Sequence, residues 1–95
     1  MSNKMEPSFH LKVVSREGIL FEGGVTSITS YNEEGKFDVL SQHANFISLI
    51  TKGVEIAEVN QKITKNIPFD NALVRVRENN AEVYIGVEGM FFKSM

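Results

Sequence analysis

Hydrophobic and polar residues alternate along most of the chain, which is typical of β-strands that bury one face. Residues 9–13 (FHLKV) alternate in this way near the start, and residues 81–88 (AEVYIGVE) do so near the end. No segment repeats its hydrophobic residues with the helical period of about 3.6. Strand-like segments follow one another at intervals of roughly 8 to 12 residues, as in sandwiches and barrels. The pattern therefore predicts an all-β protein.

The predicted strands are short and belong to a single domain. Turn-forming residues interrupt the pattern repeatedly, so we expect a small antiparallel β-sandwich of about 8 to 10 short strands. The expected strands lie at residues 9–14, 19–22, 25–31, 35–41, 46–51, 54–59, 62–68, 72–77 and 81–88. Gly23 and Gly24 are expected to mark a bulge or bend between two of them. We assign residues 1–7 to a flexible N-terminus, 8–90 to the sandwich domain and 91–95 to a C-terminal tail.

The corner His43-Ala44-Asn45 joins two strand-like halves in the middle of the chain. Before the corner, Phe37 and Val39 fall on one face at the strand period of two. After it, residues 46–51 are rich in β-branched and aromatic side chains, which predicts a strand buried on both faces. The acidic pair Glu33-Glu34 stands just upstream, so we expect the corner to lie beside a charged tip.

Composition excludes several functional classes. The 95 residues, 42% of them hydrophobic, suffice for one core. A formal net charge of −2 gives no basic patch for nucleic acid and no attraction to anionic lipid. The chain has no cysteine, so it can form neither disulfides nor thiolate metal sites. No signal peptide and no apolar run near the ~20 residues of a membrane span are visible, so we expect no direct insertion into a membrane.

Catalytic chemistry is not indicated either. Asp38, Ser41 and His43 are of the residue types in a catalytic triad, but alternation along a strand directs Asp38 away from the other two. The histidines are too far apart in sequence for a recognisable metal-ligand spacing. The glycines never form a phosphate-binding motif. We therefore predict no catalytic residue, no metal site and no cofactor.

Two further features stay open from the sequence alone. Arg75 and Arg77 share one face of a predicted strand, which is either a solvated sheet face or a patch for an acidic partner. Phe91 and Phe92 either pack onto the sandwich as a last strand or form an exposed apolar patch for a partner.

Residues 9–53 resemble the N-terminal β-sandwich of the epsilon subunit of F-type rotary ATP synthases, and the spacing agrees without a gap. That family has a Val-Val-Ser type strand end, an apolar-Phe hairpin with a glycine, and a signature around His-Ala that ends in glycine. The matching positions here are Val13-Val14-Ser15, Leu20-Phe21-x-Gly23, Gly35-x-Phe37-x-Val39, His43-Ala44, Ile47, Ile50 and Gly53.

The chain departs from the family signature where the family has small or rigid residues. Asp38 replaces its second glycine, while Ser41, Asn45 and Lys52 replace prolines. Lys36 stands where the family often has an acidic residue. The family's C-terminal pair of helices is missing from the 95 residues, so the resemblance implies that inhibition by those helices, and nucleotide binding through them, are absent.

The resemblance implies a non-catalytic subunit of the central stalk, which binds gamma and contacts the c-ring to couple rotation to ATP synthesis. Such a subunit is peripheral, at the cytoplasmic face of the cell membrane, and we expect it to be a monomer when isolated. The ring-facing residues implied are Glu33, Glu34, Lys36, Phe37, Asp38, Ser41, Gln42 and His43. The gamma-facing residues implied are His43, Asn45 and Phe46.

A stand-alone β-sandwich that binds other proteins is the alternative, because a fold does not determine a function. The changed positions of the signature favour it. A small hydrolase ranks last, because it would need convergent polar groups in a pocket that so short a chain has little room to form.

Overall fold

The computed structural model describes residues 7–86, which form seven strands and no helix. The strands are β1 (Phe9–Ser15), β2 (Gly18–Asn32), β3 (Gly35–Leu40), β4 (Phe46–Glu58), β5 (Lys65–Ile67), β6 (Asn71–Arg77) and β7 (Asn80–Ile85). The all-β prediction is confirmed. Our assignments for residues 1–6, for Val87 and Glu88, and for the tail 91–95 with Phe91-Phe92 lie outside the described residues.

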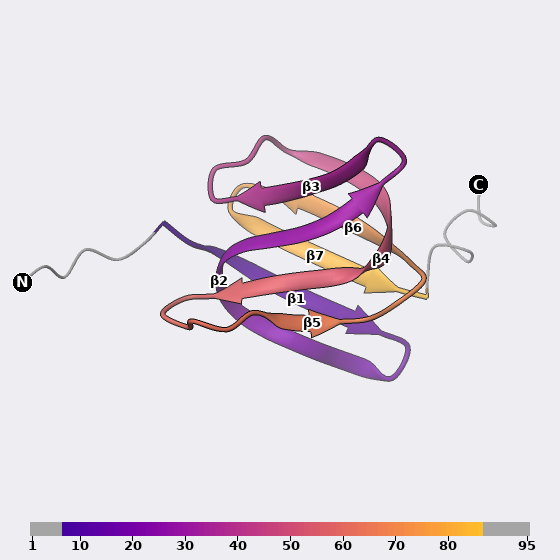
Figure 1. Ribbon diagram of the computed structural model, residues 1–95, viewed down its shortest axis with the longest axis horizontal. Helices are drawn as coiled ribbons and strands as arrows, with labels where there is room; N and C mark the ends of the chain where they lie inside the picture. Colours follow the sequence, from indigo (N-terminus) through magenta and orange to yellow (C-terminus); the bar gives the residue numbers. More distant parts are fainter. Residues whose placement is uncertain (1–6, 87–95) are drawn as a thin grey trace, which may run out of the picture.

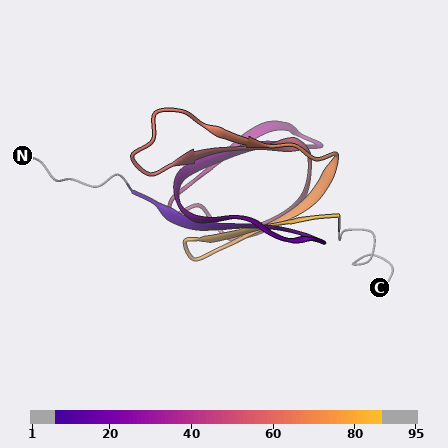
Figure 2. The ribbon, with the colours of Figure 1, turned by 90° about the horizontal axis from the view of Figure 1, so that it is seen from below.

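The strands form two layers that share β2 and β4 (Figure 1 and Figure 2). The first layer runs β3-β2-β4-β5, and the second runs β2-β1-β7-β6-β4. All neighbouring strands are antiparallel except β1 and β7, which are parallel. Because these two strands are far apart in the sequence, no short turn forces them into opposite directions. The predicted antiparallel sandwich is therefore correct apart from this one pair.

Two strands are longer than predicted, and the described residues consequently form fewer strands than the expected 8 to 10. Segments 19–22 and 25–31 join into β2, and segments 46–51 and 54–59 join into β4. Each long strand changes pairing partner along its length: β2 pairs first with β1 and then with β3 and β4. A bend inside a strand, rather than a break, carries the chain from one layer to the other.

The bend in β4 lies at Lys52-Gly53 and is held by a buried hydroxyl. Gly53 has φ +77°, and a Cβ there would lie 2.8 Å from the carbonyl oxygen of Ile67, so only glycine fits. The hydroxyl of Ser30, which is 2% exposed, donates to the carbonyl oxygen of Gly53 at 2.8 Å. The register between β2 and β4 shifts at this point, and Ser30 gives the bulged backbone a partner.

Alternate residues of the strands fill the space between the two layers. Phe37 and Val39 share one face of β3 as predicted, and this face points inward; Val83 points inward as well. The buried core cluster consists of Phe9, Leu11, Val13, Phe21, Val25, Ile28, Val39, Ile50, Val54, Ile56, Ala72, Val74, Val76, Ala81 and Val83.

The prediction that residues 46–51 are buried on both faces is wrong. Ile50 is buried, but Ile47 and Leu49 are 55% and 45% exposed on the outside of the second layer. Sequence alone could not separate a doubly buried strand from one whose outward residues happen to be apolar, because both read as a continuous apolar run.

Candidate functional site

The predicted partner-binding residues divide between the two ends of β3. Glu33 and Glu34 form the turn before the strand, whereas Ser41, Gln42 and His43 follow its last residue. An extended chain rises about 3.3 Å per residue, which puts the two groups roughly 20 Å apart. The expectation that the corner lies beside the charged tip is therefore wrong. We call residues 33–34 the acidic turn and residues 41–45 the corner.

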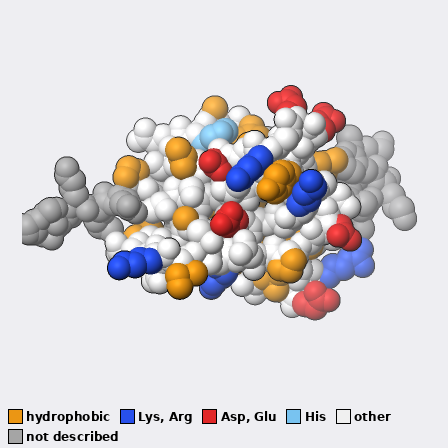
Figure 3. All heavy atoms as spheres, viewed as in Figure 1, with side chains coloured by type: hydrophobic (Ala, Val, Ile, Leu, Met, Phe, Trp, Pro, Cys, Tyr) orange, Lys and Arg blue, Asp and Glu red, His pale blue; other side chains and the backbone are white. Residues whose placement is uncertain are grey.

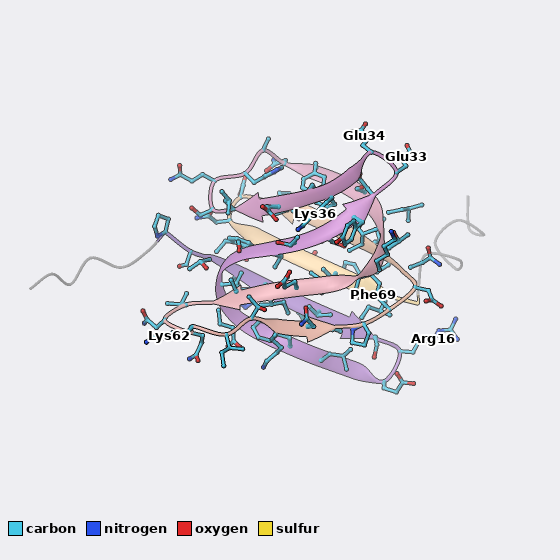
Figure 4. The ribbon with its side chains drawn as sticks, viewed as in Figure 1. Arg16, Glu33, Glu34, Lys36, Lys62 and Phe69 are labelled. Carbon is cyan, nitrogen blue, oxygen red and sulfur yellow. The ribbon has the colours of Figure 1, made fainter. Side chains whose placement is uncertain are left out.

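The acidic turn is exposed and has one local hydrogen bond. It closes the hairpin of β2 and β3 at the pair Asn32–Gly35, and the backbone N–H of Glu34 donates to Oδ1 of Asn32 at 2.9 Å. Figure 4 shows Glu33 and Glu34 at the outer tip of the hairpin. Lys36 follows them on β3, on the front of the first layer. Both carboxylates and the Lys36 ammonium are therefore available to a partner.

The corner is held by the β6–β7 hairpin, which is far away in sequence. The backbone N–H of Gln42 donates to Oδ1 of Asn79 at 2.9 Å, and the N–H of Glu78 donates to Oδ1 of Asn45 at 3.1 Å. Glu78 and Asn79 are the two loop residues of that hairpin, with φ of +50° and +64°. Such positive φ values suit a tight two-residue turn. Asn45, where the related family has proline, thus serves the structure through its side chain.

Three aromatic rings contact one another at the corner. The His43 and Phe46 ring centroids lie 4.9 Å apart, and those of Phe46 and Phe37 lie 5.9 Å apart in an edge-to-face arrangement. Edge-to-face pairs add to the stabilisation that burial alone supplies. His43 also contacts its own neighbour, with Nδ1 lying 2.8 Å from the carbonyl oxygen of Ala44. All three side chains are half-buried, so the corner presents a partly apolar surface.

The polar residues between the two ends do not converge. Thr29 on the adjacent strand donates its hydroxyl to Asp38 Oδ1 at 2.5 Å. His43 is engaged with Ala44 and Phe46, and neither Asp38 nor His43 contacts Ser41 among the interactions of the described residues. The described residues contain no group of three or more His, Asp or Glu side chains that could hold a metal ion. Within residues 7–86 there is also no helix long and apolar enough to cross a membrane.

The outside of the second layer carries a surface that sequence reasoning missed. Neighbouring strands align apolar residues across this face, from β2 through β1, β7 and β6 to β4. This outer apolar row consists of Ile19, Val14, Tyr84, Leu73 and Leu49, of which Leu73 is buried and the other four are partly or well exposed. Ile47 lies beside it on β4. The only signal in the sequence was the run 46–51, which we interpreted as core.

A row of charges runs parallel to the outer apolar row. Glu22, Lys12, Glu82 and Arg75 follow one another on adjacent strands with alternating sign. Arg75 donates to Glu82 Oε1 through Nε at 3.0 Å and through Nη2 at 2.6 Å. Of the two readings that the sequence left open, a solvated sheet face or a patch for an acidic partner, the structure shows Arg75 already paired with Glu82, while Arg77 is exposed.

The Arg75–Glu82 pair perturbs the titration of its members. Burial raises the pKa of Glu82, but hydrogen bonds from Arg75 and Tyr84 and the positive charge of Arg75 outweigh it, so that this pKa lies below its usual value. The hydrogen bond to Glu82 and its negative charge raise the pKa of Arg75. Burial and the contact with Glu82 raise the pKa of Tyr84. Within the charge row, Arg75 and Glu82 thus interact directly across β6 and β7, together with Tyr84.

The first layer has a different outer face. In Figure 3, which shows this side, Lys/Arg and Asp/Glu side chains are interspersed and hydrophobic side chains occur singly. Lys52 lies over the ring of Tyr31, with Nζ 5.1 Å from the centroid. A surface hollow of about 400 Å³ between Asn32, Glu33, Leu49 and Asn71 connects the acidic turn to the end of the outer apolar row. The two layers therefore offer a polar and an amphipathic surface.

A family model described as the β-sandwich domain of the ATP synthase delta/epsilon chain matches residues 8–91. The chain belongs to this family. The resemblance given by residues 9–53 is therefore confirmed and extends over both layers of the sandwich. Of the departures from the family signature, Asn45 uses its side chain to hold the corner.

Curated relatives carry the name ATP synthase epsilon chain. The chain is 37% identical over 75 residues to that of a Nitratiruptor species, covering 79% of this chain and 58% of the relative. It is 32% identical over 79 residues to that of Sulfurimonas denitrificans, covering 83% of this chain and 59% of the relative. The chain thus spans about three fifths of the length of the curated relatives it matches.

Solved structures share the fold. A chain in the Euglena gracilis mitochondrial ATP synthase, solved with OSCP, F1 and the c-ring, matches with a TM-score of 0.75 and 12% identity. That match covers 90% of this chain and 54% of the other. A chain in the Tetrahymena thermophila mitochondrial ATP synthase central stalk and c-ring matches with a TM-score of 0.69 and 9% identity, covering 86% of this chain and 66% of the other. At such identities the likeness concerns the fold.

Proposed function

We propose that this chain supplies the β-sandwich of an epsilon-type central-stalk subunit in an F-type ATP synthase. Its role is non-catalytic: it binds gamma, contacts the c-ring and so helps to couple rotation to ATP synthesis. The observation that carries the proposal is the family match over residues 8–91, together with relatives named ATP synthase epsilon chain. A subunit of this kind reaches the cytoplasmic face of the membrane through the complex.

We assign the gamma contact to the corner and to the adjoining outside of the second layer. His43, Asn45 and Phe46 begin a surface that continues along β4 through Ile47 and Leu49 into the outer apolar row. Apolar side chains that line up over several strands and are partly exposed are unusual on a solvated sheet face and are typical of partner surfaces. The parallel charge row would give that contact orientation and specificity.

We assign the c-ring contact to the opposite end of β3. Glu33, Glu34 and Lys36 are exposed there, and ion pairs among the described residues involve none of them. Charged groups at an exposed tip steer association and contribute modestly to affinity. Phe37 and Asp38 lie on β3 between this end and the corner, whereas Ser41 and Gln42 belong to the corner itself. We retain all four residues as part of the surface that a partner of β3 covers.

Co-expression with gamma from the same genome, followed by size-exclusion chromatography, tests the assignment. We expect a one-to-one complex. Ile47→Lys should abolish it, because a charge would be buried in an apolar contact. Ile63→Lys is the matched control: Ile63 is 82% exposed in the loop before β5, and its substitution should leave the complex intact.

Charge reversal at Lys36 separates the two contacts. Lys36→Glu should leave the complex with gamma intact and change the retention of that complex on detergent-solubilised c-ring. If the unsubstituted chain elutes alone at micromolar concentration beside folded gamma, the central-stalk function is wrong and the stand-alone binding module takes its place.

A further inference from the structure

β3 is an outer strand of the first layer with one unpaired edge. It pairs with β2 over its whole length without a register shift, and no other strand of the described residues pairs with it. The strand is six residues long and contains no proline. An unpaired, regular strand edge presents backbone donors and acceptors to which a further strand can add.

Alternation along the ladder determines which backbone groups point outward. The pair Asn32–Gly35 closes the two-residue turn, so Gly35, Phe37 and Val39 direct their N–H and C=O groups towards β2. Lys36, Asp38 and Leu40 therefore direct theirs to the free edge. The Leu40 carbonyl oxygen accepts the N–H of His43 at 3.2 Å, which agrees with this assignment. Lys36 and Asp38 retain outward groups with no partner among the hydrogen bonds of the described residues.

The other outer strand of this layer does not offer an equivalent edge. β5 is three residues long and is followed directly by Pro68, which lacks an N–H. Its Lys65 lies over the ring of Phe21 on the N-terminal half of β2 and pairs with Glu58. The chain thus blocks one edge and leaves the edge of β3 open.

We propose that two copies of this chain associate through antiparallel pairing of their β3 edges, centred on Phe37. In this register Lys36 of one copy lies opposite Asp38 of the other, and the two-fold axis repeats the pair. Each Lys36–Asp38 position exchanges two backbone hydrogen bonds because both residues direct their backbone groups outward. The two-fold axis therefore produces two ion pairs and completes the ladder.

The charges exclude the neighbouring registers. A register centred on Lys36 would put two lysines opposite each other and Glu34 opposite Asp38. A register centred on Asp38 would put two aspartates opposite each other. Directly opposed like charges are destabilising in a sheet, whereas opposite charges are favourable. Of these three registers, only the one centred on Phe37 places opposite charges across from each other.

The register also brings apolar side chains together. Phe37 would lie opposite its own copy, on the side of the strand that faces the sandwich interior. Phe37 and Phe46 are both half-buried and already in edge-to-face contact, so the axis would join two such pairs into a cluster of four rings. The half-buried rings would lose exposed surface, which favours association.

The inference goes beyond the proposed function and replaces the expectation that the isolated chain stays a monomer at high concentration. The edge includes Lys36 and lies between the acidic turn and the corner, so pairing would compete with any partner that covers β3. Ile47 and Leu49 are on the other layer, and binding there would not require the edge. A variant that no longer dimerises could therefore still bind gamma, and a variant that no longer binds gamma could still dimerise.

Sedimentation velocity on the unsubstituted chain tests the pairing, from about 10 μM to about 1 mM, the range in which so small an interface dissociates. We expect a reversible monomer–dimer equilibrium that salt weakens. Lys36→Asp and Asp38→Lys should each raise the dissociation constant about tenfold, because each turns both ion pairs into like-charge pairs. The double variant Lys36→Asp/Asp38→Lys recreates both pairs in exchanged positions and should restore association.

Amide exchange of Lys36 and Asp38 supplies the second readout. Their N–H groups should become more protected as the concentration rises, while those of Phe37 and Val39 stay unchanged. Circular dichroism melts confirm that each variant is folded. A monomer over the whole range, or a double variant no tighter than the single ones, overturns the proposal. Dimerisation with unchanged exchange at Lys36 and Asp38 also overturns it, because the interface then lies elsewhere.

Discussion

The acidic turn and the corner terminate the same strand, yet they are held in different ways. The turn at Glu33-Glu34 has a hydrogen bond only to its neighbour Asn32. The corner has two hydrogen bonds to the β6–β7 hairpin, and its His43 ring belongs to a cluster of three aromatic rings in contact. Both ends of the strand are polar in sequence, so the local pattern carries no sign of this difference.

The comparison separates residues that carry structure from residues that carry only surface chemistry. At the corner, a substitution removes contacts between segments far apart in sequence, so stability and partner binding change together. At the turn, a substitution removes solvated charge, so binding should change alone. Four predictions test this separation.

The largest effect is expected for Phe46→Ala. It removes the ring that contacts both Phe37 and His43 and should lower the free energy of unfolding by about 2 kcal/mol, less than for a fully buried phenylalanine. Urea denaturation measures the change. Leu40→Ala is the control: Leu40 is 57% exposed, and its truncation should change the free energy by less than about 0.5 kcal/mol. Equal effects would mean that the rings do not hold the corner.

Asn45→Ala should lower the free energy of unfolding by about 1 kcal/mol, since Glu78 N–H loses its side-chain acceptor. Asn45→Asp keeps an oxygen at that position and should recover part of the loss. Amide exchange at Glu78 reports the bond directly. Unchanged exchange in Asn45→Ala would show that the bond between the corner and the hairpin does not form.

The hairpin that supports the corner depends on pH through Glu82. Its pKa is lower in the folded than in the unfolded chain, so its contribution is complete above the unfolded value of about 4.3 and disappears as pH falls through the folded pKa. Glu82→Gln should lower stability by about 0.5 kcal/mol at neutral pH, since the pair is partly exposed, and by less at pH 3.

Urea midpoints at the two pH values measure the difference for Glu82. In an Arg75→Gln background the same substitution should show a smaller dependence on pH, because the partner that lowers the pKa of Glu82 most is missing. A persistent dependence would assign the effect to another group.

The smallest effect on stability is expected at the acidic turn. Glu33→Gln and Glu34→Gln together should change the free energy of unfolding by no more than about 0.3 kcal/mol, because neither carboxylate forms an ion pair with a described residue. Thermal melts check this, and retention on the c-ring should change in the same variant. A destabilised double variant would mean that the turn, like the corner, carries structure.

Local patterns predicted most strands but not how they continue. Alternation identified residues 9–13 and 81–85 correctly because one face of each strand meets the core. Gly23-Gly24 was expected to mark a bulge or bend between two strands, since glycine is typical of such positions. In the structure β2 pairs with β1 through both glycines without a register shift, and β4 continues past Gly53 to pair with β2.

The sequence by itself determined the all-β class, the inward face of β3, the family and the residues of the acidic turn. These follow from local periodicity and spacing, which require no knowledge of distant segments. The tertiary structure decided that the turn and the corner lie apart, that Asn45 meets Glu78, and that Ile47 and Leu49 face outward. Each of these three features depends on which strands become neighbours in the sheet. Pairing across long sequence separations is a property of the whole sheet and of no single segment.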